Sequence, residues 1–167
     1  MKLDTFLNNK KEWIEQAIDM GTYCVDGTVE LTDNIKHIEN LDIVVDKIRN
    51  LVQKKLLDDN TAWNVSVVLG TLLGEMLINK HNYKWAINDE EIPVVETPDK
   101  NQLSPITKIY RILISKENDE GSPSSFYNGF LALEKINNMS EEEKKEITIY
   151  LHDGEFISAT EWKDEEE

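Results

Sequence analysis

The chain contains 167 residues, a length typical of one domain, and 40% of them are hydrophobic, which is enough to build a buried core. Its 33 acidic side chains outnumber 18 basic ones, so the formal net charge is -15. The hydrophobic content excludes a disordered acidic tail. The charge excludes nonspecific binding to nucleic acid or to an anionic membrane, because both surfaces are recognised by basic side chains.

Cysteine usage and hydropathy predict a cytoplasmic protein without a membrane segment. A lone cysteine, Cys24, cannot form an internal disulfide. The first residues, Met1 to Asp4, lack the apolar core of a secretory signal. The most apolar stretch, residues 65–78, is shorter than the roughly 20 residues that cross a bilayer.

The N-terminal third predicts two amphipathic helices with an irregular stretch between them. Apolar residues at helical spacing indicate a first helix over residues 4–20, with Gly21 as its left-handed cap. Residues 23–31 resemble a hairpin about an Asp-Gly turn, but their short flanking runs equally fit an ordered loop. A second helix is expected from Ile38 or Asn40 to Leu57.

A third helix is expected over residues 61–79, after a capping signal at residues 58–61. Because this helix is apolar nearly all round, we expect it at the centre of the core. Two short strands should follow, over residues 83–87 and 92–97, joined by a polar turn.

The C-terminal half predicts further helices and a last pair of strands. Ser104-Pro105 and Ser122-Pro123 each match a helix start, with serine as the cap and proline as the first helical residue. Ser140 opens a capping box. Residues 147–151 and 155–159 alternate like strands. The sequence therefore predicts one α+β domain over residues 1–167, with helices around a small antiparallel sheet and residues 139–167 as an acidic extension.

Signatures of catalysis and of metal or cofactor binding are missing from the sequence. It has no glycine-rich phosphate loop, no nucleophile elbow and no zinc motif. The three histidines, His37, His81 and His152, are far apart and have no second ligand at suitable spacing. Acidic runs such as residues 89–91 fit solvated turns, since a calcium loop needs alternating ligands and a central glycine. We expect no metal and no cofactor.

The sequence Leu69-Gly70-Thr71-Leu72-Leu73-Gly74-Glu75 is the most pointed local feature of the chain. Two glycines four residues apart lie on one face of a helix and cost roughly 2 kcal/mol in helix propensity relative to alanine. This cost indicates that another part of the chain approaches closely at Gly70 and Gly74. Glu75, within an apolar run, is either a structural partner of a hydrogen bond or ion pair, or a catalytic carboxylate.

The order of these motifs resembles that of a bacterial family of uncharacterised domains. The Leu-Gly-x-x-x-Gly-Glu helix precedes an aromatic strand at Trp85, a Val-Val-Glu strand at residues 94–96 and a helix that contains Pro105. Phe126 and Tyr127 match an aromatic pair in the last helix, so the resemblance spans residues 38–133. It implies an α+β domain and no reaction. We expect Gly70, Gly74 and Trp85 to have structural roles.

Three functions fit these observations. The first is a non-catalytic protein-binding module, such as an immunity protein or antitoxin, that covers a basic protein partner. The second is a small enzyme that uses Glu75, with His81 or Trp85 nearby. The third is an oligomerisation module that uses Gly70 and Gly74 for helix contact; the sequence leaves the oligomeric state open. The missing catalytic signatures favour the first, non-enzymatic function.

The acidic charge is concentrated at the C-terminus, and this locates the predicted binding surface. Residues 139–167 contain 11 acidic and 3 basic side chains, whereas the first 138 residues contain 22 and 15. The binding residues predicted here are two Glu triplets: Glu141, Glu142, Glu143, Glu165, Glu166 and Glu167. Truncation after Asn138 should therefore weaken binding of a basic partner more than neutralising any acidic cluster elsewhere.

Overall fold

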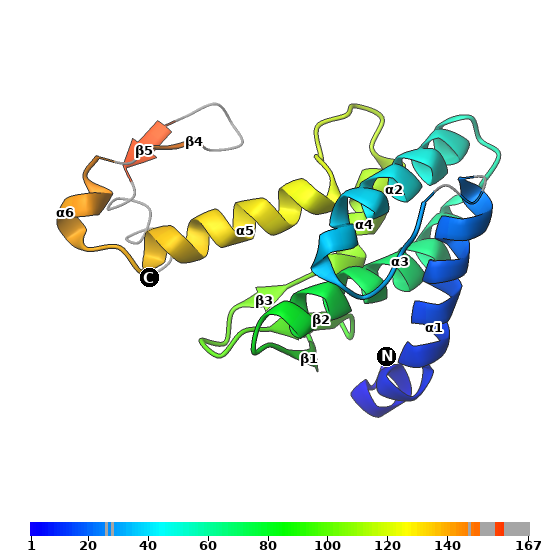
Figure 1. Ribbon diagram of the computed structural model, residues 1–167, viewed down its shortest axis with the longest axis horizontal. Helices are drawn as coiled ribbons and strands as arrows, with labels where there is room; N and C mark the ends of the chain where they lie inside the picture. The colour runs from blue at the N-terminus through cyan, green and yellow to red at the C-terminus, as the bar shows by residue number, and fades with distance from the viewer. Residues whose placement is uncertain (26, 28, 147, 151–155, 159–167) are drawn as a thin grey trace. The chain divides into compact units, whose positions relative to one another are not determined.

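The computed structural model describes residues 1–25, 27, 29–146, 148–150 and 156–158. Within these residues it shows helices and short antiparallel strands (Figure 1), which confirms the predicted α+β class. The chain's contacts divide it into two units, residues 1–126 and 127–167. The boundary lies within one helix, twelve residues ahead of the acidic extension expected from residue 139.

The first unit contains most of the secondary structure. Its elements are α1 (Leu3–Cys24), the 3-10 helix η1 (Ile35–His37), α2 (Ile38–Gln53), α3 (Asp59–Lys80), β1 (Lys84–Ile87), β2 (Pro93–Glu96), β3 (Gln102–Leu103) and α4 (Pro105–Ile114). α5 (Pro123–Asn137) begins in this unit and continues into the second. The second unit adds α6 (Glu141–Lys144), β4 (Thr148–Tyr150) and β5 (Phe156–Ser158).

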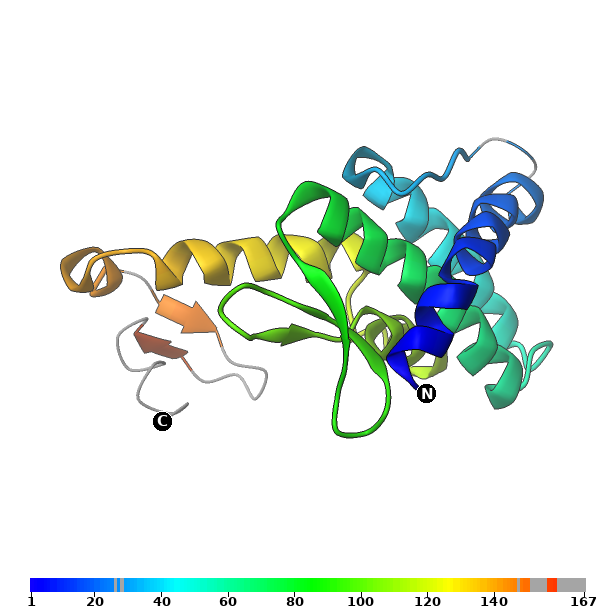
Figure 2. The same ribbon diagram turned by 90° about the horizontal axis from the view of Figure 1, so that it is seen from below.

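Helix α3 forms the centre of the first unit, as its all-round apolar sequence predicts. Every residue from Val68 to Leu77 is buried, and the helix contacts α1, α2 and α4 (Figure 2). Asp58 begins the helix by accepting a hydrogen bond from the Thr61 backbone N–H at 2.8 Å. By length and composition α3 could cross a bilayer, but 72% of its most apolar window is buried inside the structure, the pattern of a core helix.

The sheet of the first unit has three antiparallel strands in the order β1-β2-β3. β2 is central, and its Val94 and Val95 are fully buried where the strand contacts α3 and α4. Trp85 on β1 pairs with Val95 in the register of the first two strands. The third strand was not predicted, because it has only two residues and no alternating pattern.

The predicted end of the first helix is wrong, and its cause is a packing contact. α1 continues through Gly21 to Cys24. A Cβ atom on Gly21 would lie 2.9 Å from Cγ of Leu31, so this glycine makes room for the returning chain instead of ending the helix. Of the two alternatives for residues 23–31, the described residues favour the loop, because Tyr23 is helical and residues 29–32 form no strand. Asp26 and Thr28 lie outside the described residues.

Helix α2 ends four residues earlier than predicted. Lys55 has a φ of 57°, and the Leu56 backbone N–H bonds back to the Leu51 carbonyl at 3.0 Å, a left-handed termination of the helix. Leu56, which falls inside the predicted range, lies on the surface beyond the end of the helix.

The two Ser-Pro sequences begin helices, but only one serine side chain acts as a cap. Ser122 Oγ accepts the backbone N–H of Ser125 at 3.2 Å, and Ser125 Oγ accepts that of Ser122 at 2.7 Å. The predicted side-chain cap at Ser104 is wrong, since this hydroxyl makes no capping hydrogen bond and only the Ser104 carbonyl accepts, from the Lys108 N–H.

The second unit follows the predicted order of short elements. Ser140 and Glu143 form the expected capping box at the start of α6. β4 and β5 pair antiparallel, with Ile149 opposite Ile157. The predicted strand ends at residues 147, 151, 155 and 159 lie outside the described residues.

Candidate functional site

Glu75 lies buried between α1 and the sheet, with two partners on one oxygen. Its Oε1 accepts Nζ of Lys10 on α1 at 2.9 Å and the indole Nε1 of Trp85 on β1 at 2.6 Å. Phe6 of α1 packs on the Trp85 ring, with the ring centroids 4.6 Å apart. The carboxylate therefore joins α3 to β1, the next element along the chain, and to α1, whose Lys10 is 65 residues away.

These contacts give Glu75 a structural role. Glu75 is not among the residues that line the described cavities of about 350, 310 and 480 Å³. His81, the other residue named for the enzyme hypothesis, stacks its ring on Tyr83 at 4.8 Å. Within the described residues, no group of three His, Cys, Asp or Glu side chains is placed to hold a metal ion.

Gly70 and Gly74 face neighbours within the same chain. A Cβ on Gly70 would lie 2.5 Å from Cα of Ile106, so the backbone of α4 passes directly over it. A Cβ on Gly74 would lie 2.2 Å from Cη2 of Trp85, so this glycine makes room for the indole ring. The face assigned to helix contact in an oligomer is thus covered by α4 and β1.

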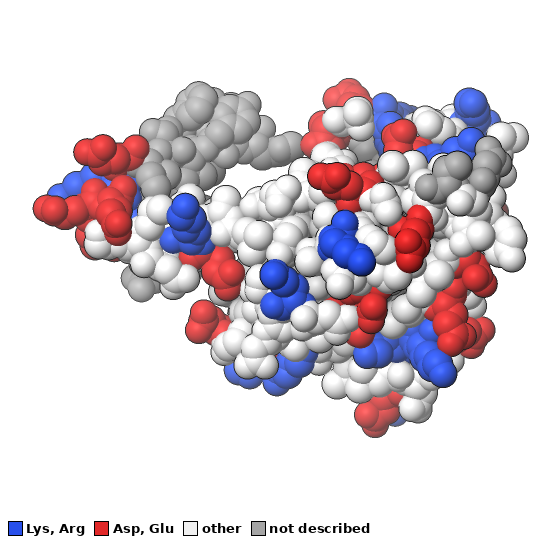
Figure 3. All heavy atoms as spheres, viewed as in Figure 1, with Lys and Arg blue, Asp and Glu red and all other residues white. Residues whose placement is uncertain are grey.

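The acidic residues of α6 are exposed on the second unit (Figure 3). Glu141, Glu142 and Glu143 all face solvent, whereas Lys144 is buried and pairs with Glu141 at 3.3 Å. A hollow of about 480 Å³ is lined by Met139, Glu142, Glu143 and Glu146. Glu165, Glu166 and Glu167, the other predicted binding residues, lie outside the described residues.

The capping box keeps one of these glutamates ionised. The Ser140 backbone N–H and hydroxyl bond to the Glu143 carboxylate at 2.8 and 2.9 Å, and they lower the pKa of this group below its ordinary value. At neutral pH the hollow is therefore bordered by carboxylates with one apolar side chain among them.

Several acidic side chains of the first unit have local structural partners instead. Thr61 hydrogen bonds lower the pKa of Asp58, the cap of α3. Lys100 and Lys84 flank Glu96 at 3.1 and 3.2 Å and lower the pKa of its carboxyl. These carboxylates thus have partners within the first unit, as Glu141 and Glu143 of α6 have within the second.

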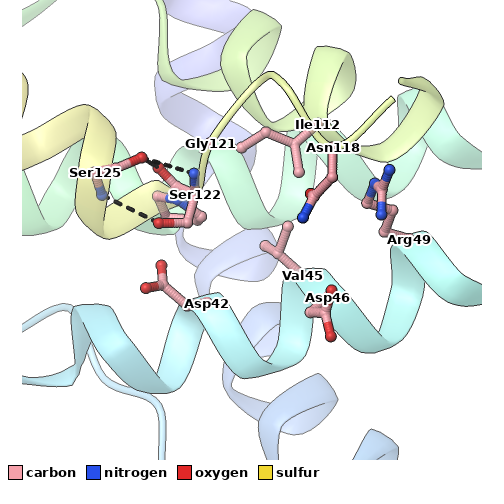
Figure 4. A pocket seen from close by; sticks show the side chains of 10 residues that line it. Asp42, Val45, Asp46, Arg49, Ile112, Asn118, Gly121, Ser122 and Ser125 are labelled. Atoms are coloured by element: carbon pink, nitrogen blue, oxygen red, sulfur yellow. Dashed lines mark hydrogen bonds between the residues drawn. The ribbon is translucent and has the colours of Figure 1, made fainter. Parts of the chain in front are cut away.

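A separate cavity of about 350 Å³ lies in the first unit between α2 and the chain that enters α5 (Figure 4). Four of its lining residues recur at helical spacing on one face of α2: Asp42, Val45, Asp46 and Arg49. Ile112 of α4 and the segment that includes Asn118, Gly121, Ser122, Pro123 and Ser125 complete the lining. The sequence does not reveal this site, because its two sides are about 70 residues apart and neither contains a ligand-binding motif.

Asp42 fixes one end of this cavity by capping α5. Its Oδ1 accepts the Ser124 backbone N–H at 2.8 Å, and its Oδ2 accepts the Ser124 hydroxyl. Asp42→Ala should lower the free energy of unfolding by about 1–2 kcal/mol, the typical effect of losing a helix cap. Urea denaturation measures this loss.

Asp46→Ala is the matched control for that substitution, since Asp46 lies one turn further on α2, is exposed, and makes no recorded side-chain contact within the described residues. It should change stability by no more than about 0.5 kcal/mol. Equal losses at both positions would show that the Asp42 contact to α5 contributes nothing.

Comparison of the chain with protein-family models, curated proteins and solved structures found no match. The family resemblance drawn from the Leu-Gly-x-x-x-Gly-Glu motif therefore stays a prediction.

Proposed function

We propose that the protein is a non-catalytic binding module that covers a basic protein partner through its C-terminal acidic segment. The observation that carries this proposal is the exposure of Glu141, Glu142 and Glu143 on α6, in the part of the sequence where the net negative charge is concentrated. We place this activity in the cytoplasm, where the single cysteine, Cys24, stays reduced.

The hollow beside α6 supports recognition of a basic side chain. Glu142, Glu143 and Glu146 offer carboxylates to an ammonium or guanidinium group, while Met139 offers a flexible apolar surface to its hydrocarbon stem. Complementary charge of this kind raises the rate of association and selects against acidic partners. Its contribution falls as salt rises, because the groups are exposed to solvent.

The enzyme and oligomer hypotheses lack a comparable observation. The carboxylate of Glu75 is already bonded to Lys10 and Trp85, and Gly70 and Gly74 pack against Ile106 and Trp85 of the same chain. Neither arrangement offers a group that could act on a second molecule. An immunity- or antitoxin-like inhibitor needs only the exposed surface.

Affinity capture from the source cells tests the proposal. The tagged protein should recover a basic protein at low salt, and Glu141→Gln/Glu142→Gln/Glu143→Gln should recover much less of it. Glutamine keeps the shape of each side chain and is accepted at the third helical position of a capping box, so α6 should stay formed.

A second triple variant, Asp89→Asn/Glu90→Gln/Asp99→Asn, removes the same charge from exposed positions of the first unit. This control should recover the partner as well as the unchanged protein does. Recovery of no basic protein at either low or high salt would contradict the proposal, as would equal losses in the two triple variants.

A further inference from the structure

The cavity between α2 and the start of α5 has charged groups of both signs that the protein itself leaves available. Asp46 has no recorded side-chain partner within the described residues. Among the contacts of the described residues, Arg49 donates only from Nη2, to the Ser115 carbonyl at 3.0 Å, and a guanidinium group has five N–H donors. The Asp46 carboxylate and an Arg49 guanidinium with further N–H donors therefore line the same cavity (Figure 4).

The helix end beside the cavity offers no site for a simple anion. Pro123 has no N–H, Ser124 donates to Asp42, and Ser125 and Phe126 donate to Ser122. All backbone donors of the first turn of α5 are thus satisfied, so phosphate or a similar anion would find only Arg49, with two carboxylates close by. A simple cation would be repelled by the positive charge of Arg49.

A ligand with both charges fits this arrangement. Asp46 and Arg49 are three residues apart on α2, which brings their Cβ atoms about 5–6 Å from each other. They form no ion pair with each other within the recorded salt bridges of the described residues. One molecule can therefore place an ammonium on Asp46 and a carboxylate on Arg49, which binds carboxylates through paired hydrogen bonds.

The rest of the lining sets the size and character of such a ligand. A volume of about 350 Å³ is at the small end of ligand pockets. Val45, Ile112 and Pro123 form the apolar base of the cavity; each is nearly covered by the protein, so only a short hydrocarbon part of a ligand can contact them. Asn118 extends from the opposite side toward α2 and adds an amide that can donate or accept (Figure 4).

We propose that this cavity binds a small zwitterion, a molecule that carries an ammonium and a carboxylate a few bonds apart, as a free amino acid does. The ammonium bonds to Asp46, the carboxylate bonds to Arg49, and the aliphatic part packs on Val45 and Ile112. This site is independent of the acidic surface on α6 and of any basic partner.

Amide chemical shifts of the ¹⁵N-labelled full chain test this proposal with matched probes. γ-Aminobutyrate and L-leucine are the zwitterions, and butyrate and n-butylammonium each carry one of the two charges on a similar hydrocarbon. At millimolar concentration at least one zwitterion should shift the amides of Asn118, Gly121 and Ser122 to saturation. The two single-charge probes should leave them unchanged.

Substitutions then identify the groups that bind. Asp46→Asn and Arg49→Gln should each weaken the zwitterion at least about tenfold, because each removes a charged hydrogen-bonding partner. Glu39→Gln and Lys47→Gln change the same charges at exposed positions of α2 that do not line the cavity, and they should leave binding unchanged. Asp46→Asn decides the outcome if Arg49→Gln unfolds the protein, since Asp46 has no recorded contact to lose.

Three results would overturn the proposal. The first is the absence of saturable shifts with both zwitterions. The second is equal binding of the zwitterions and the single-charge probes. The third is an equal loss of binding in Asp46→Asn and its control Glu39→Gln.

Discussion

Alanine at Gly70 or Gly74 should destabilise the protein by about 1–3 kcal/mol, although alanine is the better helix former by about 1 kcal/mol. At Gly70 the added methyl group would lie 2.5 Å from a backbone atom of α4, so the whole helix has to move. At Gly74 it would lie 2.2 Å from the Trp85 ring. Displacing that ring also breaks the indole hydrogen bond to Glu75, which adds to the loss.

Thermal and urea denaturation measure this effect, and a third glycine provides the control. Gly129 lies in α5 and has no atom within 4 Å of the place where its Cβ would be. Gly129→Ala should therefore keep or raise stability, by up to about 1 kcal/mol. If alanine at Gly70 and Gly74 stabilised the protein as much as at Gly129, the close packing of α3 against α4 and β1 would be refuted.

Lys10→Met should cost about 1–3 kcal/mol, because it leaves the buried Glu75 carboxylate with the Trp85 indole as its remaining recorded partner. The Lys10 side chain is 28% exposed and that of Glu75 is 9% exposed, so the unpaired carboxylate is the more costly of the two groups to leave behind. Glu75→Gln should therefore be milder. The double variant Lys10→Met/Glu75→Gln should recover part of the loss.

A double-mutant cycle by urea denaturation measures the coupling between Lys10 and Glu75. The matched control is Lys11→Met, because Lys11 is 89% exposed and lies 3.9 Å from Glu15 on the surface. It should change stability by less than about 0.5 kcal/mol. Equal effects of Lys10→Met and Lys11→Met, or no coupling between Lys10 and Glu75, would contradict the structural role given to this ion pair.

Local patterns in the sequence predicted most of the fold, because they report on contacts between near neighbours. The periodic apolar residues of α2 and α3 located both helices, and Ser122 and Ser140 marked helix starts that the structure contains. The spacing of Gly70 and Gly74 indicated a close approach. Which elements approach, α4 and β1, could not be predicted, since this depends on the path of the chain.

The errors occur where a distant contact decides the local conformation. Glycine is a common residue at the end of a helix, but the packing of Gly21 against Leu31 keeps it inside α1. A structural partner was one of two alternatives for Glu75, and nothing in the sequence pointed to Lys10, which is 65 residues away. The two-residue strand β3 depends on pairing with β2 and has no pattern of its own.

The two candidate sites also differ in whether the sequence alone could predict them. The acidic residues of α6 are adjacent in sequence, so composition alone found them. The cavity beside α2 joins Asp46 and Arg49 to Asn118 and Ser122, and only the folded chain brings these residues together. Its polar residues are ordinary surface types, which is why no motif identified it.

The association rate of the captured basic partner, measured against ionic strength, tests the proposed function most directly. The unchanged protein and the Asp89/Glu90/Asp99 variant should associate fast at low salt and more slowly as salt rises. The Glu141/Glu142/Glu143 variant should associate about tenfold more slowly at low salt and depend less on salt. Equal rates and equal salt dependence for all three proteins would contradict binding through the acidic surface of α6.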